Sequence, residues 1–262
     1  PPPSFQAEDG IRDGPQCLVG SEMCIRDRLA AAFGPATRAI VLNTPNNPTG
    51  HVLTRSELEA IAELCQRHDA WAITDEIYEH ILYDGVHVPM ACLPGMSDRT
   101  VTVSGASKTF SVTGWRVGTI VAPAGASGAI RKVHDFLTVG APAPLQEAVA
   151  TALETRGDDY YQELANAYRR RRDLMVGALK TAGFRCTPPA GAYYILADFS
   201  EFSDQRDTAF AMALARDAGV ASVPGSSFYA DPADGRSLVR FAFCKSESLL
   251  RQAGARLLSA SS

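Results

Sequence analysis

The sequence predicts an α/β protein, in which a mostly parallel sheet with helices on both faces is followed by a smaller α+β domain. Between residues 38 and 137, short apolar runs alternate with stretches of helical spacing, which is typical of strands joined by helices. After a long helical pattern, strands and helices follow one another in a more mixed order. A chain of 262 residues, 46% of them hydrophobic, can bury a large core and a smaller one.

The first 28 residues do not match the rest of the chain. They mix proline, glycine and charge without a sustained helix or strand period, and they lack the apolar core of a signal peptide. The strings at residues 6–13 and 17–28 resemble translated sequencing-adapter DNA. We therefore interpret residues 1–28 as a non-native leader. We expect the natural protein to begin upstream of Leu29, with its N-terminal portion absent here.

The large domain is predicted to begin with an apolar, β-branched strand at residues 38–42. This strand runs into Asn43-Thr-Pro-Asn-Asn-Pro-Thr-Gly50, where two prolines and a glycine fix a tight polar loop. Thr54-Arg-Ser-Glu57 is a capping box, and apolar residues then keep helical spacing to about His68. Three further strands are predicted at residues 70–74, 101–103 and 117–122.

The second half of the chain is dominated by helical patterns at residues 127–137, 146–154 and 160–182, the last of which ends at Gly183. A helix that long is expected to link a large domain to a smaller one. We predict a partial large domain at residues 29–145, a linking helix at 146–182 and a small domain at 183–262. Within the small domain, strands are predicted at 184–187, 193–197, 220–223 and 238–243, and helices at 208–218 and 246–258.

Composition excludes several classes of function. The formal net charge of −4 gives no footprint for nucleic acid, and no apolar run approaches the length of a membrane span. The basic run at residues 169–172 lies in a helical pattern and is interpreted as a solvated helix face. Six scattered cysteines without metal-site spacing predict reduced, mostly buried thiols in a cytoplasmic protein.

Polar residues follow three of the predicted strands. Asn47 follows the first, Asp75 and Tyr78 follow the second, and Ser107 and Lys108 follow the third. In parallel α/β sheets, ligands bind beyond the carboxyl ends of the strands, so we expect these side chains to share one edge. Taken singly, each has a plainer interpretation: Asp75 as a helix N-cap, Asn47 as a turn former and Lys108 as a solvated surface lysine.

Together these residues suit one cofactor. Lys108 can form a Schiff base with an aldehyde, and Ser107 with Arg116 can hold a phosphate, so pyridoxal phosphate (PLP) would use both groups. A carboxylate at Asp75 can pair with the protonated pyridine nitrogen. Asn47 and Tyr78 can donate hydrogen bonds to the ring oxygen and tune the protonation of the neighbouring imine.

Arg240 stands in the otherwise apolar run Ser237-Leu-Val-Arg-Phe-Ala-Phe243. A guanidinium in such a strand needs a partner, and its planar fork suits a substrate carboxylate. A salt bridge to an internal acid and an edge-strand position are equally good explanations.

These motifs resemble those of the class I/II aminotransferases of PLP fold type I. The resemblance covers nearly all of residues 29–262 and is carried by Asn43–Gly50, Ile73–Tyr78, Ser104–Arg116 and Val239–Phe241. Within the family, the sequence is most similar to kynurenine, glutamine and methionine aminotransferases. The resemblance implies an incomplete PLP fold type I large domain and a homodimer with shared active sites.

The resemblance also implies residue roles. Lys108 would carry PLP as a Schiff base and move the substrate proton, Asp75 would pair with the pyridinium, and Arg240 would bind the substrate α-carboxylate. Ser104 would be a further phosphate ligand beside Ser107 and Arg116. The family's N-terminal arm, its glycine- and serine-containing phosphate loop and its ring-stacking aromatic have no counterpart in this sequence. We therefore expect this chain to bind PLP poorly, and we do not expect it to reach the turnover of a complete family member.

The expected reaction moves an amino group from an L-amino acid to a 2-oxo acid. Two alternatives remain open from the sequence: a PLP-dependent cysteine-conjugate β-lyase, and the aminotransferase-like sensing domain of a transcription regulator. The sequence does not define the amino acid or the oxo acid. Tyr83, Phe110 and Tyr193 are equally compatible with packing and with an apolar or aromatic substrate side chain.

Overall fold

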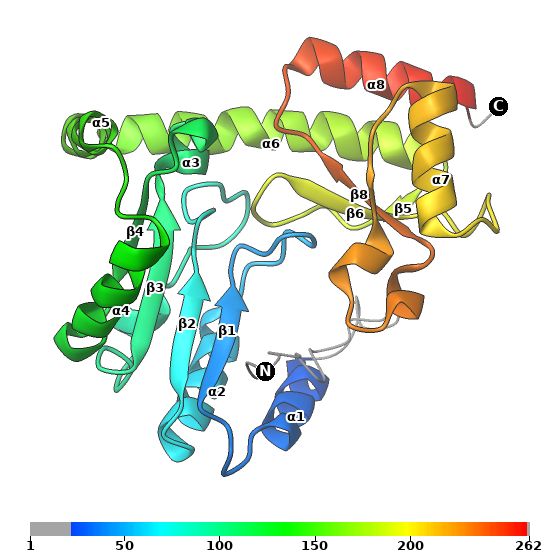
Figure 1. Cartoon of the computed structure of the whole chain (residues 1–262). Coiled ribbons are helices and arrows are strands. Elements are labelled where there is room, and N and C mark those ends of the chain that lie inside the picture. Colours follow the sequence, from blue (N-terminus) through cyan, green and yellow to red (C-terminus); the bar gives the residue numbers. More distant parts are fainter. Residues whose placement is uncertain (1–21, 261–262) are drawn as a thin grey trace. The chain divides into compact units, whose positions relative to one another are not determined.

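A computed structural model describes residues 22–260 (Figure 1). The chain divides into two compact units. The first comprises residues 33–167 and 190–192 and is called the lysine unit. The second, called the C-terminal unit, comprises residues 168–189 and residues 193 onward, together with helix α1 (Glu22–Ala32). The predicted domain boundaries at 145/146 and 182/183 stay predictions.

The lysine unit contains a sheet of β1 (Ala39–Asn43), β2 (Trp71–Asp75), β3 (Thr100–Gly105) and β4 (Gly118–Val121), in that order. The first three strands are parallel, and β4 is antiparallel to β3. The predicted α/β class with a mostly parallel sheet is confirmed. The helices of this unit are α2 (Arg55–Arg67), α3 (Ala106–Thr109), α4 (Ala124–Leu137), α5 (Ala143–Thr155) and the first part of α6 (Asp158–Thr181), with short 3₁₀ turns at Met90–Cys92 and Thr113–Trp115.

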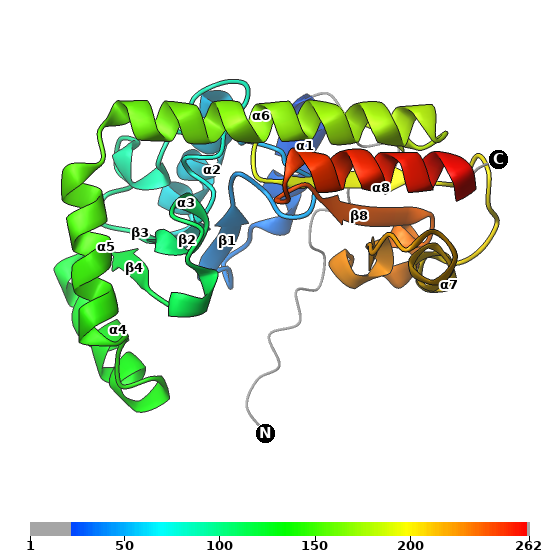
Figure 2. The ribbon, with the colours of Figure 1, turned by 90° about the horizontal axis from the view of Figure 1, so that it is seen from above.

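Helix α2 forms as the sequence predicts. Glu57 N donates to Thr54 Oγ1 at 3.2 Å and Thr54 N donates to Glu57 Oε2 at 2.6 Å, so the capping box is complete. Its apolar face is buried, with Leu58 1% and Cys65 0% exposed. On the other flank of the unit, α4 and α5 lie on the β4 side of the sheet in both views (Figures 1 and 2).

The C-terminal unit contains a second sheet, ordered β5 (Arg185–Cys186), β6 (Tyr194–Asp198), β8 (Leu238–Ala242) and β7 (Val223–Pro224), with all pairs antiparallel. Helix α8 (Glu247–Ala260) runs beside the second half of α6, where Arg170 and Glu247 form a 3.6 Å ion pair (Figure 2). A cluster of aromatic rings forms the core, including Phe199 stacked on Phe210 at 4.0 Å. The remaining elements are α7 (Asp207–Ala213), a π-helical turn at Leu214–Ala218, and 3₁₀ turns at Gly225–Phe228 and Pro232–Gly235.

Several expectations about local structure are wrong. Residues 22–28 belong to α1, although no element was predicted there; the rest of the predicted leader lies outside the described residues. The strand predicted at 220–223 is shorter in the structure, where β7 comprises Val223–Pro224. The helix predicted at 208–218 changes to a π-helical turn at Leu214–Ala218, and the left-handed backbone of Gly219, with φ 64°, terminates that turn.

The basic run and the cysteines also differ from expectation. Arg172 is only 8% exposed, and its Nη1 donates to Pro189 O at 3.2 Å. The predicted solvated face therefore does not include Arg172. The four cysteines whose side chains the structure describes are all free thiols, but only Cys65 among them is buried. None of the helices in the described part of the chain has the length and apolar character that crossing a membrane requires.

Candidate active site

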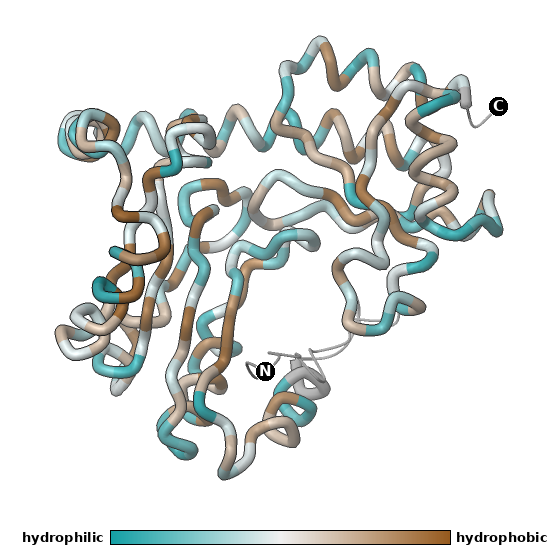
Figure 3. The backbone as a smooth tube through the Cα atoms, viewed as in Figure 1, coloured by the Kyte–Doolittle hydropathy of each residue, from teal (hydrophilic) through white to brown (hydrophobic). Residues whose placement is uncertain are grey.

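The carboxyl ends of β1, β2 and β3 meet at one edge of the sheet. Asn43 pairs with Asp75 across β1 and β2, and Asp75 pairs with Val103 across β2 and β3. The chain is apolar along β1 and becomes hydrophilic in the loop that follows it (Figure 3). The polar residues after the three strands therefore share this edge, as expected for a ligand site in a parallel sheet.

The loop after β1 is held by asparagine side chains. Asn43 Nδ2 donates to Asp75 O at 3.0 Å, while its Oδ1 accepts from Asn47 N at 2.7 Å. Asn46 Oδ1 accepts from the hydroxyl of Thr49 at 2.8 Å, and both X–Pro bonds of the loop are cis. Asn43 thus joins the loop to the end of β2, and half-buried Asn47 has a fixed backbone.

Asp75 is the last residue of β2 and is half-buried. Its Oδ1 accepts from Ile77 N at 3.2 Å, which fixes the carboxylate over the start of the next turn. It forms no ion pair with any residue that the structure describes. Tyr78 lies in the same turn and is only 4% exposed.

Lys108 lies in α3, which follows β3 directly, and is half-buried. Gly105 allows β3 and β4 to approach closely before this helix, because a Cβ there would lie 2.8 Å from Gly118 Cα. Ala106 N then donates to Val117 O at 3.3 Å, so the connection that carries Lys108 starts and ends at adjacent points of the sheet.

The same connection carries Ser107 and Arg116. The Thr113 hydroxyl donates to Ser107 O at 3.1 Å, and Arg116 Nη1 donates to Thr113 O at 3.2 Å. Arg116 has a left-handed backbone with φ 55° and an exposed side chain, and within the described part of the chain it forms no ion pair. A guanidinium is therefore presented beside the lysine without an acidic partner.

Ser104, the further predicted phosphate ligand, contacts a carboxylate instead. Its hydroxyl donates to Glu79 Oε1 at 2.5 Å. A phosphate would have to compete with Glu79 for this donor, so Ser104 is a less suitable ligand than Ser107 or Arg116 as the structure stands.

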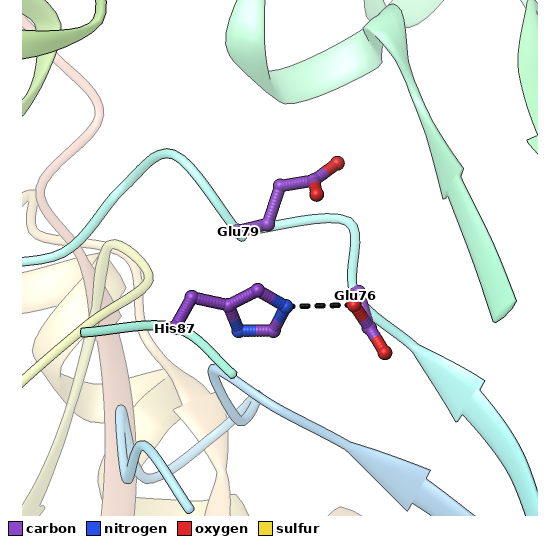
Figure 4. Close-up of side chains that lie close together, drawn as sticks. All are labelled: Glu76, Glu79 and His87. Carbon is purple, nitrogen blue, oxygen red and sulfur yellow. Dashed lines mark hydrogen bonds and ion pairs between the residues drawn. The ribbon is translucent and has the colours of Figure 1, made fainter. Parts of the chain in front are cut away.

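Sequence reasoning missed a cluster formed by Glu76, Glu79 and His87. Their ligand atoms lie within 4.8 Å of one another, and His87 Nε2 lies 2.7 Å from Glu76 Oε2 (Figure 4). Burial lowers the pKa of neighbouring His80 and the charge of His87 lowers it further, while Glu79 opposes both effects. Glu76 and Glu79 flank Tyr78 in the sequence, but only the fold brings His87 to them.

Arg240 lies in the C-terminal unit, in the middle of β8, which pairs with both β6 and β7. The edge-strand explanation is therefore wrong. Its guanidinium lies 4.2 Å from the centre of the Tyr194 ring and 4.8 Å from that of Phe228. These two cation–π contacts compensate part of the cost of placing a cation in an apolar strand.

The three aromatic residues that could have faced a substrate all take part in packing. Tyr83 is 3% exposed, and its hydroxyl donates to Ala192 O. The ring centres of Phe110 and Tyr160 lie 5.6 Å apart, and those of the stacked rings of Tyr193 and Tyr168 lie 5.7 Å apart. Packing therefore accounts for each of them without a substrate.

Comparison with known proteins gives a consistent result. The model of the family described as "Aminotransferase class I and II" matches residues 24–257. A kynurenine–oxoglutarate transaminase from Dictyostelium discoideum is 39% identical over 255 residues, covering 89% of this chain and 59% of the relative. A methionine aminotransferase from Escherichia coli is 38% identical over 229 residues, covering 87% of this chain and 59% of the relative.

Solved structures agree with these relatives. An N-succinyldiaminopimelate aminotransferase from Mycobacterium tuberculosis matches with a TM-score of 0.85 at 41% identity, over 89% of this chain and 61% of the other. The chain thus spans about three fifths of the length of these relatives, 59% in both sequence comparisons.

Proposed function

Because the chain belongs to the class I and II aminotransferases, we propose that it carries out the PLP-dependent transfer of an amino group from an L-amino acid to a 2-oxo acid. The support is the joint occurrence, at one sheet edge, of an amine, a carboxylate, amide and hydroxyl groups and a guanidinium. The names of the relatives favour transamination over a β-lyase or a regulator's sensing domain.

The donor set of the lysine unit fits PLP, the cofactor of this family. Asp75 is a half-buried carboxylate without a described cationic partner, which suits a protonated ring nitrogen. Arg116 is an exposed cation without a described acidic partner, which suits a phosphate. Asp75 ends β2 and Arg116 lies in the connection from β3 to β4, at the same edge of the sheet, so one bound molecule carrying both complementary charges would satisfy both.

Each residue of the site has a role in this proposal. PLP, when bound, supplies an aldehyde that links to amines and a cationic ring that withdraws electrons from the attached carbon. Lys108 Nζ would hold the cofactor covalently and, once displaced by the substrate amine, would take the proton from the substrate α-carbon and deliver it to the carbon two atoms away, on the other side of the nitrogen. Asp75 keeps the ring nitrogen protonated, and Asn47 and Tyr78 donate hydrogen bonds to the ring oxygen. Ser107 and Arg116, with Ser104 as a weaker donor, bind the phosphate.

Arg240 is proposed to bind the α-carboxylate of the substrate. The rings of Tyr194 and Phe228 lie 4.2 Å and 4.8 Å from the guanidinium, and the planar fork of an arginine suits bidentate binding of a carboxylate. Because one site serves both substrates in turn, ping-pong kinetics are expected. Arg240→Lys should raise KM for both substrates more than it lowers kcat.

We also propose that the enzyme is a homodimer in the cytoplasm. Apolar side chains that are strongly exposed on the lysine unit, such as Phe136 at 94% and Leu137 at 75%, support an association surface. The four described free thiols support a reducing compartment. Analytical ultracentrifugation tests the dimer, and a monomer at all concentrations would contradict it.

Absorption spectroscopy tests the function. With saturating PLP, the chain should develop a band at about 420 nm that Lys108→Ala abolishes. Lys132→Ala is the matched control, because Lys132 is an exposed lysine of α4, and it should leave the band unchanged. A band that survives Lys108→Ala, or that Lys132→Ala removes equally, would contradict the assignment.

A further inference from the structure

The turn that follows β2 carries two of the residues assigned to PLP and has a well-defined backbone. Residues 75–81 are called the post-β2 turn. Glu76 N donates to Val103 O at 2.8 Å and so extends the β2–β3 ladder by one bond. Glu79 N then donates to Glu76 O at 2.9 Å, and Ile81 N donates to Tyr78 O at 2.8 Å. The direction in which Asp75 and Tyr78 point depends on this turn.

Glu76 is the most deeply buried side chain of the cluster shown in Figure 4, at 1% exposed. Its Oε1 accepts from the Thr74 hydroxyl at 2.8 Å, and its Oε2 lies 2.7 Å from His87 Nε2. A buried carboxylate is costly unless both oxygens have donors, and here both do. His87, itself 9% exposed at its side chain, thereby joins the loop after residue 84 to the post-β2 turn.

Glu79 provides a second connection, from the same turn to β3. Its Oε1 accepts from the Ser104 hydroxyl, and Ser104 lies four residues before Lys108. The Thr74 hydroxyl also lies 3.3 Å from the Thr102 hydroxyl, so β2 and β3 are linked by side chains as well as by backbone. The network therefore connects the turn that carries Asp75 to the strand that leads to the lysine.

We propose that Glu76 and His87 are positioning residues for the PLP site, holding Asp75 and Tyr78 in register with Lys108. This inference rests on the proposed function. Because both oxygens of Glu76 already have protein donors, the cluster is interpreted as a hydrogen-bond network rather than as a cation site. Neither residue is assigned to an atom of the cofactor or substrate, so the effect would be transmitted through the backbone of the post-β2 turn.

Two variants at one position separate positioning from simple space filling. His87→Leu fills much of the same space but cannot donate to Glu76. His87→Gln keeps an N–H donor near the position of Nε2 and is the conservative rescue. In hydrogen–deuterium exchange of the chain without PLP, His87→Leu should speed exchange in residues 76–81 by about tenfold, and His87→Gln should leave it close to wild type. PLP titrations should show the same order, with affinity about tenfold lower in His87→Leu.

The chain contains a matched control. His51 Nε2 lies 3.1 Å from Glu57 Oε1, a second histidine–glutamate pair in the lysine unit but at the start of α2. His51→Leu should speed exchange at that helix start and leave residues 76–81 unchanged. The proposal is overturned if His87→Leu matches wild type, or if the Leu and Gln variants are impaired equally. If wild type gives no Lys108-dependent band, the transamination proposal fails, and the exchange data separately support or overturn the role in holding the turn.

Discussion

The two sheets of the molecule are stabilised in different ways. In the C-terminal unit, strand side chains such as Ile195, Val239 and Phe241 are 0–1% exposed. In the lysine unit, Val41 on β1 is 73% exposed, and Ile120 and Val121 on β4 are 49% and 65% exposed. Order at the strand ends of the lysine unit comes instead from hydrogen bonds made by Asn43, Asp75 and Glu76.

This difference predicts which kind of substitution destabilises each unit most. Removing packed volume should unfold the C-terminal unit, because its core has little room to adjust. Removing a single donor in the lysine unit should cost less stability, but it should disturb the groups assigned to PLP. The following changes test this contrast, from the largest expected effect on stability to the smallest.

Truncation of a strand side chain should affect the two sheets very differently. Phe241 is 1% exposed and packs edge-on against Phe184 at 5.5 Å, so Phe241→Ala should lower the free energy of unfolding by about 3–5 kcal/mol. Val41→Ala, in the exposed strand, should change it by less than about 0.5 kcal/mol. Urea unfolding of both variants measures this, and similar losses in the two would remove the contrast.

A methyl group at Gly105 tests the close approach of β3 to β4. The added Cβ would lie 2.8 Å from Gly118 Cα and 3.0 Å from Val117 O, and both contacts are backbone. Gly105→Ala should therefore cost about 1–3 kcal/mol. It should also weaken PLP binding, because α3 with Lys108 follows at once. In Gly128→Ala, where the new Cβ meets nothing within 4 Å, the helix should be unchanged or slightly more stable. Thermal unfolding and PLP titration of the two variants test this prediction. Equal Tm values and equal PLP affinities in the two variants would contradict the packing argument.

Acid should weaken the start of α2. Burial raises the pKa of Glu57, but hydrogen bonds from His51 and Thr54 outweigh it, and the pKa falls from 4.5 to about 2. Since the folded pKa lies below the unfolded one, this stabilisation is fully present above pH 4.5 and is lost as the pH falls toward 2. Glu57→Gln should lower stability by about 1 kcal/mol near neutral pH and flatten the acid limb of a Tm–pH series.

Glu59→Gln provides the control for this series. Glu59 is 51% exposed, and its one ion pair with a described residue is with Arg55 at 3.5 Å on the helix surface. Its removal should shift Tm little at any pH. An acid limb that is equally steep in wild type and in Glu57→Gln would show that Glu57 does not cause the acid sensitivity.

Local patterns predicted much of the fold. The capping box at Thr54, the strand that leads to Asp75 and the helical stretch that ends at residue 218 each depend on a few consecutive residues, and the structure contains all three. The failures are tertiary in origin. The helical pattern around residues 169–172 predicts a solvated basic face, yet the fold brings Pro189 O to Arg172.

The candidate site shows the same limit. The parallel order of the strands predicted that their carboxyl ends meet at one sheet edge, and the register pairs Asn43 with Asp75 and Asp75 with Val103. The partnership of Glu76 with His87 could not be predicted, because it depends on how an irregular loop folds back over the turn. For the same reason, the sequence did not reveal that the Ser104 hydroxyl donates to Glu79.

The most direct test of the central claim is to find which lysine carries PLP. The chain is incubated with excess PLP, the linkage is fixed by borohydride reduction, and the digested peptides are identified by mass spectrometry. We expect the pyridoxyl group on the peptide that contains Lys108, with much less label in Asp75→Asn, whose amide cannot pair ionically with the ring nitrogen. Label spread evenly over Lys108, Lys132, Lys180 and Lys245, unaffected by Asp75→Asn, would contradict the assignment of the site.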